Sequence, residues 1–259
     1  MKNKLIITAV VLVVLAVGYF GYTRLTANKG QQTEQAAPQP PASQTQEPGG
    51  FDKTLHSIDE PGSPWWIVNK QRPLPADYKV TELTAPDIKL RWARDAETMQ
   101  VSQEIVPSLE AMDKALRSAG FQLELISGYR SSDYQKMLYD SHVDQYGQEE
   151  ADRQSAKPGT SEHQTGLTVD LGRTDKECDL LECFGGLPEG EWLARHAHEY
   201  GFIIRYPKGK EQYTGYMYEP WHLRYVGKEL AAELQAKSVT MEEFFGLYSH
   251  SKTKPVNSR

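Results

Sequence analysis

Residues 28–50 contain no Ile, Leu, Val, Met, Phe, Trp or Tyr. Gln, Pro and Ser dominate this stretch, which therefore cannot bury enough apolar surface to offset the entropy cost of ordering. The segment predicts a disordered tether, with an average span of about 25–30 Å by coil scaling. A compact fold must form after it, where dense apolar content begins at Trp65 and Trp66 and continues to Tyr248. Because neither an internal repeat nor a second linker follows, residues 51–259 are expected to form one domain.

The tether is preceded by a run from Leu5 to Tyr22 that carries no charge. As a helix this run would be about 27 Å long, close to the roughly 30 Å hydrocarbon core of a bilayer. Lys2 and Lys4 come before it, as in a signal peptide or signal anchor. We expect residues 1–27 to be an uncleaved anchor of a single-pass protein whose domain lies outside the cytoplasm. The alternatives are cleavage after Ala27, which would release a secreted protein, and a buried core helix.

Charge and cysteine content exclude several classes of protein. Residues 1–50 hold four basic and two acidic side chains, so the total charge of −6 leaves −8 for the rest of the chain. An acidic domain of this kind lacks the basic surface that nucleic acid requires, and no nucleic-acid partner is expected. Two cysteines, Cys178 and Cys183, are too few for a disulfide-built scaffold or a four-cysteine zinc site. Outside the cytoplasm we expect these two cysteines to form a disulfide, which would shape a short loop at the rim of a functional site.

Apolar spacing predicts five helices after the tether. Two of them have sequences at their start that resemble capping boxes, Ser132-x-x-Gln135 and Thr240-x-x-Glu243. The expected helices cover 105–116 with Gly120 as the cap, 132–146, 192–200 with Gly201 at the end, 226–236, and a short segment after Thr240.

Strands are expected between these helices, over 122–127, 167–171 and 202–204. In the first two, apolar and polar residues alternate, which is typical of half-buried strands. Helices interleaved with short strands predict an α+β domain with a mainly antiparallel central sheet flanked by helices.

Three segments hold polar residues that packing does not require: 127–131 (SGYRS), 161–170 (SEHQTGLTVD) and 219–222 (EPWH). Two histidines and one carboxylate with a fourth position open are the ligand set of a catalytic zinc, and His163, Asp170 and His222 could supply it. Glu219 is close enough in sequence to accept a proton from a zinc-bound water. Nothing local forces these residues together, however. The alternative is that His163 and His222 are ordinary hydrogen-bonded histidines.

Longer segments resemble the VanY-type D-alanyl-D-alanine carboxypeptidases of bacterial cell walls. These are members of a zinc metallopeptidase family whose fold is shared with the hedgehog signalling domain and is also called lysostaphin-like. The resemblance covers about residues 68–245. It is carried by VNKQRPLP (68–75), SGYRS (127–131), SAKPGTSEHQTGLTVD (155–170), YGFIIRYPKGK (200–210) and TGYMYEPWHLRYVG (214–227).

The resemblance implies one zinc ion per chain, held by His163, Asp170 and His222, with Glu219 as the catalytic base. It also implies a role for Arg130, the arginine of SGYRS. That guanidinium would polarise the scissile carbonyl, stabilise the oxyanion and pair with the terminal carboxylate of the substrate.

The resemblance places Gln135 and Ser161 around the same substrate carboxylate. One position departs from the family pattern: Thr168 stands where the family more often has alanine. This change threatens no proposed ligand.

The implied function is that of a D,D-carboxypeptidase, a monomer at the bacterial cell membrane that hydrolyses the terminal D-alanine from peptidoglycan stem pentapeptides. Its purpose would be wall maturation or glycopeptide resistance. An L,D-carboxypeptidase acting on tetrapeptide stems would need the same residues and stays open as an alternative. A cytoplasmic dipeptidase of the VanX type conflicts with the predicted anchor. A non-catalytic zinc-containing binding module conflicts with the presence of Glu219 and Arg130.

Overall fold

The structure, a computed structural model, describes residues 50–247. The predicted anchor and nearly all of the predicted tether lie outside this range. Within it, no helix is long and apolar enough to cross a membrane.

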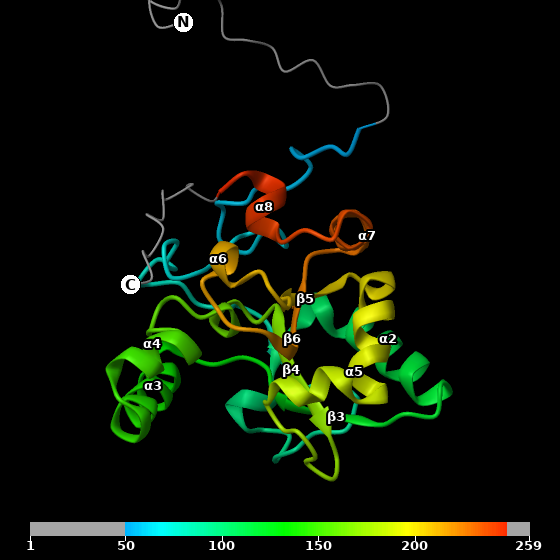
Figure 1. The fold of residues 1–259 in the computed structure, drawn as a ribbon, viewed down its shortest axis with the longest axis horizontal. Coiled ribbons are helices and arrows are strands. Elements are labelled where there is room, and N and C mark those ends of the chain that lie inside the picture. Colours follow the sequence, from blue (N-terminus) through cyan, green and yellow to red (C-terminus); the bar gives the residue numbers. More distant parts are fainter. Residues whose placement is uncertain (1–49, 248–259) are drawn as a thin grey trace, which may run out of the picture. The chain divides into compact units, whose positions relative to one another are not determined.

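A four-stranded antiparallel sheet forms the centre of the domain (Figure 1). Its strands, in spatial order, are β3 (Leu123–Ser127), β4 (Thr168–Arg173), β6 (Glu219–Tyr225) and β5 (Phe202–Tyr206). A small second sheet pairs β1 (Leu83–Thr84) with β2 (Val101–Ser102). The prediction of a single α+β domain with an antiparallel sheet is therefore confirmed.

Helices and 3₁₀ turns connect and cover these strands. The α-helices are α2 (Val106–Ser118), α3 (Ser132–Tyr146), α4 (Gln148–Gln154), α5 (Pro188–His196), α6 (Glu211–Thr214), α7 (Lys228–Lys237) and α8 (Met241–Phe245). The 3₁₀ turns are η1 (Glu97–Met99), η2 (Gln103–Ile105), η3 (Glu162–Thr165), η4 (Glu182–Gly186) and η5 (Ala197–Tyr200). In the view of Figure 1, α2 and α5 lie to the right of the sheet and the α3–α4 pair to its left.

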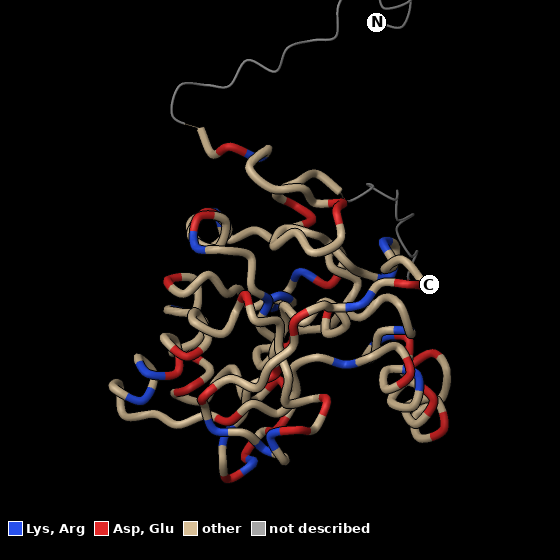
Figure 2. The backbone as a smooth tube through the Cα atoms, turned by 180° about the vertical axis from the view of Figure 1, so that it is seen from behind, with Lys and Arg blue, Asp and Glu red and all other residues tan. Residues whose placement is uncertain are grey.

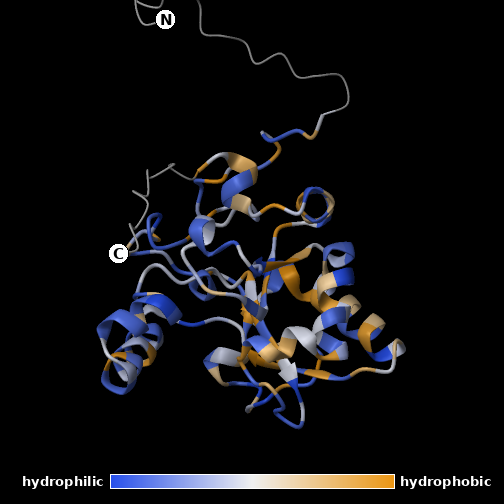
Figure 3. Ribbon diagram, viewed as in Figure 1, coloured by the Kyte–Doolittle hydropathy of each residue, from blue (hydrophilic) through white to orange (hydrophobic). Residues whose placement is uncertain are grey.

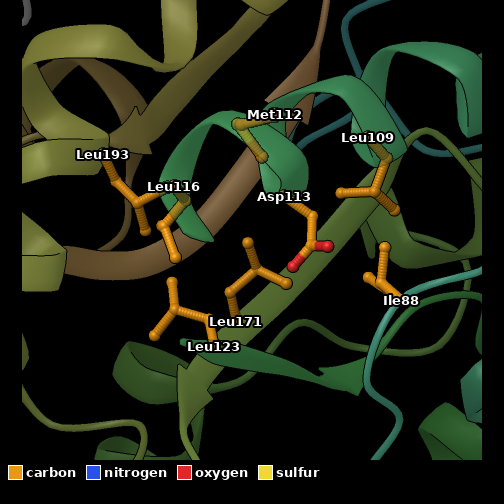
Figure 4. A pocket seen from close by; sticks show the side chains of 8 residues that line it. All are labelled: Ile88, Leu109, Met112, Asp113, Leu116, Leu123, Leu171 and Leu193. Atoms are coloured by element: carbon orange, nitrogen blue, oxygen red, sulfur yellow. The ribbon is translucent and has the colours of Figure 1, made fainter. Parts of the chain in front are cut away.

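The main core lies between the sheet and the helices α2 and α5. Figure 4 shows Leu116 of α2, Leu193 of α5 and Leu171 of β4 lining one small apolar pocket there. A second cluster joins Trp65 to apolar residues of α7 and α8. Figure 3 shows the hydrophobic residues concentrated in the sheet and beside it, whereas α3 and α4 are mostly hydrophilic. Basic and acidic residues are interspersed along the described chain (Figure 2).

Several predicted helix ends are confirmed. Gly120 has a φ of +89° and Gly201 a φ of +84°, so both adopt the left-handed conformation that suits a helix end. The capping box at Thr240 is complete, because its side chain bonds to the Glu243 amide and the Glu243 side chain bonds back. The segment 192–200 differs slightly, since the α-helix ends at His196 and continues as the 3₁₀ turn η5.

The predicted capping box at Ser132 is wrong by one residue. Ser131 is the N-cap of α3, and its Oγ accepts a hydrogen bond of 3.2 Å from the Tyr134 amide. Gln135 does not reach back to the helix start; it is buried, with its side-chain amide bonded to Ala156. The reason is tertiary: the Gln135 side chain bonds a carbonyl 21 residues further along the chain, and therefore not the start of its own helix.

The strands predicted to be half-buried are buried on both faces. All five residues of β3 and the first five of β4 are buried. Thr168 and Asp170, expected on the polar face, are 0% and 2% exposed. Their face of the sheet is covered by the loops that build the functional site, so the alternation of residue types separates the apolar core from a buried polar centre.

Candidate active site

Asp170 and His222 are brought together by the sheet. They are opposite partners in the antiparallel pairing of β4 with β6, so their side chains leave the same face. The distance between Asp170 Oδ1 and His222 Nδ1 is 3.4 Å. Asp170 Oδ1 is buried and has no hydrogen-bond partner among the described residues.

His163 approaches the same carboxylate from η3, the 3₁₀ turn before β4. Its Nδ1 lies 2.6 Å from the carbonyl oxygen of Gly128, and its Nε2 lies 3.3 Å from Asp170 Oδ2. A carbonyl oxygen can only accept, so Nδ1 carries the proton and the lone pair of Nε2 faces Asp170. Burial, with Arg130 nearby, lowers the pKa of His163 to about 4. The ring is therefore neutral at pH 7, the form that binds metal.

Gly128 belongs to the SGYRS segment and makes the contact with His163 possible. A Cβ at this position would lie 2.3 Å from the carbonyl oxygen of Gln100, a distance that no side chain tolerates. The glycine lets the segment pass close to Gln100, and the Gly128 carbonyl then reaches the imidazole.

The donor atoms of His163, Asp170 and His222 are close enough to share one zinc ion. Ligand atoms bound about 2.1 Å from zinc at the tetrahedral angle lie about 3.4 Å from each other. Asp170 Oδ2 lies 3.3 Å from His163 Nε2, and Asp170 Oδ1 lies 3.4 Å from His222 Nδ1. One ligand atom from each of His163, Asp170 and His222 lies within 4.8 Å of the other two. The donor set, two imidazoles and one carboxylate, is that of catalytic zinc sites. The predicted ligand residues therefore meet in space, and they could hold the ion.

Glu219 begins β6 beside this group. Its Oε2 lies 3.3 Å from His222 Nδ1, and the residue is 8% exposed. Burial raises the pKa of the Glu219 carboxyl above its usual value, although His222 opposes the shift. A carboxyl with a raised pKa next to the candidate metal position is suited to take up and release a proton.

Arg130 lies in the loop between β3 and α3. Its Nε donates to Ser127 Oγ at 2.8 Å, and its Nη2 donates to Asp170 Oδ2. Burial alone would raise the pKa of Asp170, but His163 and Arg130 hold it well below its usual range. With two of its nitrogens bonded, the guanidinium is fixed in one orientation at the wall of the cleft.

Gln135 and Ser161 also line the cleft, and both are buried. The Gln135 amide nitrogen donates to the Ala156 carbonyl at 2.8 Å, while its Oε1 is buried and has no partner among the described residues. The amide thus presents an acceptor, whereas a substrate carboxylate needs donors. Their role in binding a carboxylate stays a prediction.

The cleft above the candidate metal site has a volume of about 630 Å³. The loop closed by the predicted disulfide, Cys178–Cys183, forms part of its rim. Leu180 and Leu181 in this loop line the cleft and remain 42% and 57% exposed. Trp221 is half-buried and contacts both the core and the cleft. A cleft of this size with polar groups at its floor is typical of a substrate site.

Sequence reasoning missed three buried charged residues beneath this floor. Glu162 lies between two motif residues, and Arg205 and Arg224 lie in β5 and β6; their side chains are all 0% exposed. An arginine within an apolar strand could have signalled a buried partner. Tyr206 and Tyr216, whose rings are 4.5 Å apart, complete this side of the cleft.

The family model for VanY, D-alanyl-D-alanine carboxypeptidase, matches residues 98–228, which include all of the residues above. The chain therefore belongs to the VanY family. The YodJ protein of Bacillus subtilis (strain 168), a carboxypeptidase by provisional assignment, is 41% identical over 191 residues, covering 74% of this chain and 70% of YodJ.

Two solved structures extend the comparison. The LD-carboxypeptidase LdcB, studied for its recognition of peptidoglycan, is 41% identical, with a TM-score of 0.68 over 73% of this chain and 88% of LdcB. A mutant VanY D,D-pentapeptidase from a VanB-type vancomycin-resistance cassette, solved with Zn(II), is 32% identical. Its TM-score is 0.58 over 71% of this chain and 99% of that protein. The chain is thus similar to carboxypeptidases of both specificities.

Proposed function

We propose that the protein is a zinc-dependent carboxypeptidase that removes the C-terminal D-alanine from peptidoglycan stem peptides. The observation that carries this proposal is the group of three buried ligand residues whose donor atoms lie within 4.8 Å of one another, with Glu219 beside it, at the floor of a cleft. Zinc bound there would lower the pKa of a water toward about 7 and polarise the scissile carbonyl. The Zn(II) complex of a VanY relative supports the choice of metal.

The protein's own residues would supply the rest of the chemistry. Glu219 takes a proton from the attacking water and passes it to the nitrogen of the leaving D-alanine. Arg130, held by Ser127 and Asp170, donates to the oxygen that becomes negative in the transition state. A protein that only bound its ligand would not need a proton acceptor, so the buried carboxyl of Glu219 beside the metal position favours catalysis.

Two scissile bonds are chemically possible, D-Ala-D-Ala in pentapeptide stems and the L,D bond in tetrapeptide stems. The VanY pentapeptidase, at 32% identity, supports the first. LdcB, at 41% identity and with the higher TM-score, supports the second. We therefore favour L,D cleavage of tetrapeptides, with D,D cleavage as the other candidate.

Mass spectrometry separates these activities. The purified protein is incubated with UDP-linked tetrapeptide and with UDP-linked pentapeptide, and the masses of the products are measured. L,D cleavage shortens the tetrapeptide by one D-alanine and leaves the pentapeptide intact, whereas D,D cleavage shortens the pentapeptide. If neither peptide changes in the presence of zinc, the carboxypeptidase proposal is wrong.

We further propose that residues 1–27 anchor the protein as a monomer in the bacterial membrane, with the domain outside the cytoplasm. The uncharged run from Leu5 to Tyr22 supports the anchor. The Cys178–Cys183 disulfide supports an oxidising location. Fractionation of the producing cells tests whether the protein is anchored in the membrane. Protease treatment of intact spheroplasts tests whether the domain lies outside the cytoplasm.

A further inference from the structure

Glu162 is buried between His222 and two buried arginines. One of its oxygens, Oε1, accepts from Arg205 Nε at 2.8 Å and from Arg224 Nη1 at 2.9 Å. Arg205 in turn pairs with Glu242, which is 2% exposed. Two carboxylates thus balance two guanidinium groups, and the side chain of Glu162 is fixed by strong charge-assisted bonds.

The second oxygen of Glu162 points toward the candidate metal centre. Glu162 Oε2 lies 3.7 Å from His222 Nε2, and both atoms are buried without a hydrogen-bond partner among the described residues. A buried polar atom that stays unpaired loses its hydrogen bonds to water without replacement, so both atoms favour a partner. A movement of about 0.8 Å would pair them with each other, because a hydrogen bond between these atom types is about 2.9 Å long.

The direction of this bond is determined by charge. Two guanidinium groups, of Arg205 and Arg224, donate to Glu162 Oε1 at 2.8 Å and 2.9 Å, and this pairing favours the negatively charged carboxylate. An ionised carboxylate can only accept, so His222 Nε2 must carry the proton. In the neutral ring that binds metal, the lone pair of His222 then lies on Nδ1, the nitrogen that faces Asp170 at 3.4 Å and Glu219 at 3.3 Å.

We propose that Glu162 is a positioning residue that fixes the tautomer and orientation of His222 so that its Nδ1 binds the metal. This inference rests on the proposed zinc site. It gives the two histidines matching supports on their outer nitrogens: His163 by the Gly128 carbonyl, His222 by the Glu162 carboxylate. The negative charge of Glu162 also makes His222 a more basic, stronger ligand.

The variant Glu162→Gln tests the proposal, and Glu242→Gln is its matched control. Both replace one buried carboxylate of the same charge cluster, but the described contacts of Glu242, to Arg205 and Asn69, do not include His222. Zinc affinity is measured for the full chain by competition with a chelator, after circular dichroism confirms the fold. We expect E162Q to bind zinc about 10–100-fold more weakly. E242Q should stay within about threefold of wild type.

Equal zinc affinity of E162Q and wild type overturns the proposal, and so does equal weakening in E162Q and E242Q, which would indicate a general effect of the charge cluster. If the wild-type protein binds no zinc, the proposed function itself fails, which is a different result. If E162Q does not fold, nitrogen NMR of the zinc-loaded wild-type protein tests the proposal, because it shows which nitrogen of His222 carries the proton. The proposal requires the proton of His222 on Nε2 and the metal on Nδ1, and the reverse assignment overturns it.

Discussion

Asp170 on β4 lies directly opposite His222 on β6, and the 3.4 Å between Oδ1 and Nδ1 places a carboxylate and an imidazole at the spacing of two zinc ligands. The antiparallel register alone fixes this pair. His163 lies next to this pair in the 3₁₀ turn before β4. Glu219 lies next to it as the first residue of β6. The candidate centre is thus built on rigid elements of the sheet, and its supports lie in the loops around it.

Gly128 should not tolerate a side chain. Gly128→Ala would place a Cβ 2.3 Å from the Gln100 carbonyl oxygen, so the loop must move and its bond to His163 must lengthen. We expect a loss of about 1–3 kcal/mol in the free energy of unfolding, with weaker zinc binding. Gly186→Ala is the control, because a Cβ there meets nothing within 4 Å. Urea unfolding of both variants checks this, and equal stabilities would refute the packing argument.

Much of the secondary structure could be predicted because its causes are local. The capping box at Thr240 and the left-handed glycines at 120 and 201 depend on a few adjacent residues. The one-residue error at Ser132 arose because the Gln135 side chain bonds the Ala156 carbonyl, a partner distant in the sequence, and not the helix start.

The site was only partly predictable, for a different reason. The segments that carry its residues can be identified, but their convergence depends on the register of β4 and β6, which no local pattern encodes. The burial of Glu162 depends on arginines 43 and 62 residues away in the sequence. A charged residue between Ser161 and His163 reads as a solvated side chain until these partners are known.

Arg130 should be needed as a planar, fixed donor. Its Nε bonds Ser127 and its Nη2 bonds Asp170, an arrangement that the single ammonium of lysine cannot reproduce. We expect Arg130→Lys to lower kcat/KM about 10²–10³-fold, with zinc still bound. Steady-state kinetics with metal analysis tests this, and near-normal kcat/KM would remove Arg130 from the mechanism.

Amidation of the terminal D-alanine should abolish most turnover, because a carboxypeptidase recognises a free carboxylate and an unpaired charge in a partly dry pocket is costly. Rates for the free acid and the amide are compared by mass spectrometry. Equal rates would mean that internal bonds are cut, and the enzyme would be an endopeptidase.

The disulfide loop should affect substrate binding more than folding. Cys178–Cys183 closes a loop only a few residues long, so its loss costs about 2 kcal/mol in the chain-entropy account. We expect the double Cys→Ser variant to raise KM for stem peptides while zinc content stays unchanged, because Leu180 and Leu181 lose their fixed place at the rim. Replacing both leucines by serine, with the disulfide intact, should raise KM similarly. An unchanged KM in both variants would exclude the loop from substrate binding.

Zinc content and turnover, measured side by side for wild type, Glu219→Gln and His222→Ala, decide whether these residues are a base and a ligand. The wild-type protein should hold about one zinc per chain, the number expected of a site with three protein ligands and one open position. E219Q should keep the metal, and its kcat should fall about 10²–10⁴-fold. H222A should lose both metal and activity. Loss of zinc from E219Q, or full activity of the wild type after exhaustive chelation, would contradict a zinc carboxypeptidase that uses Glu219 as its base.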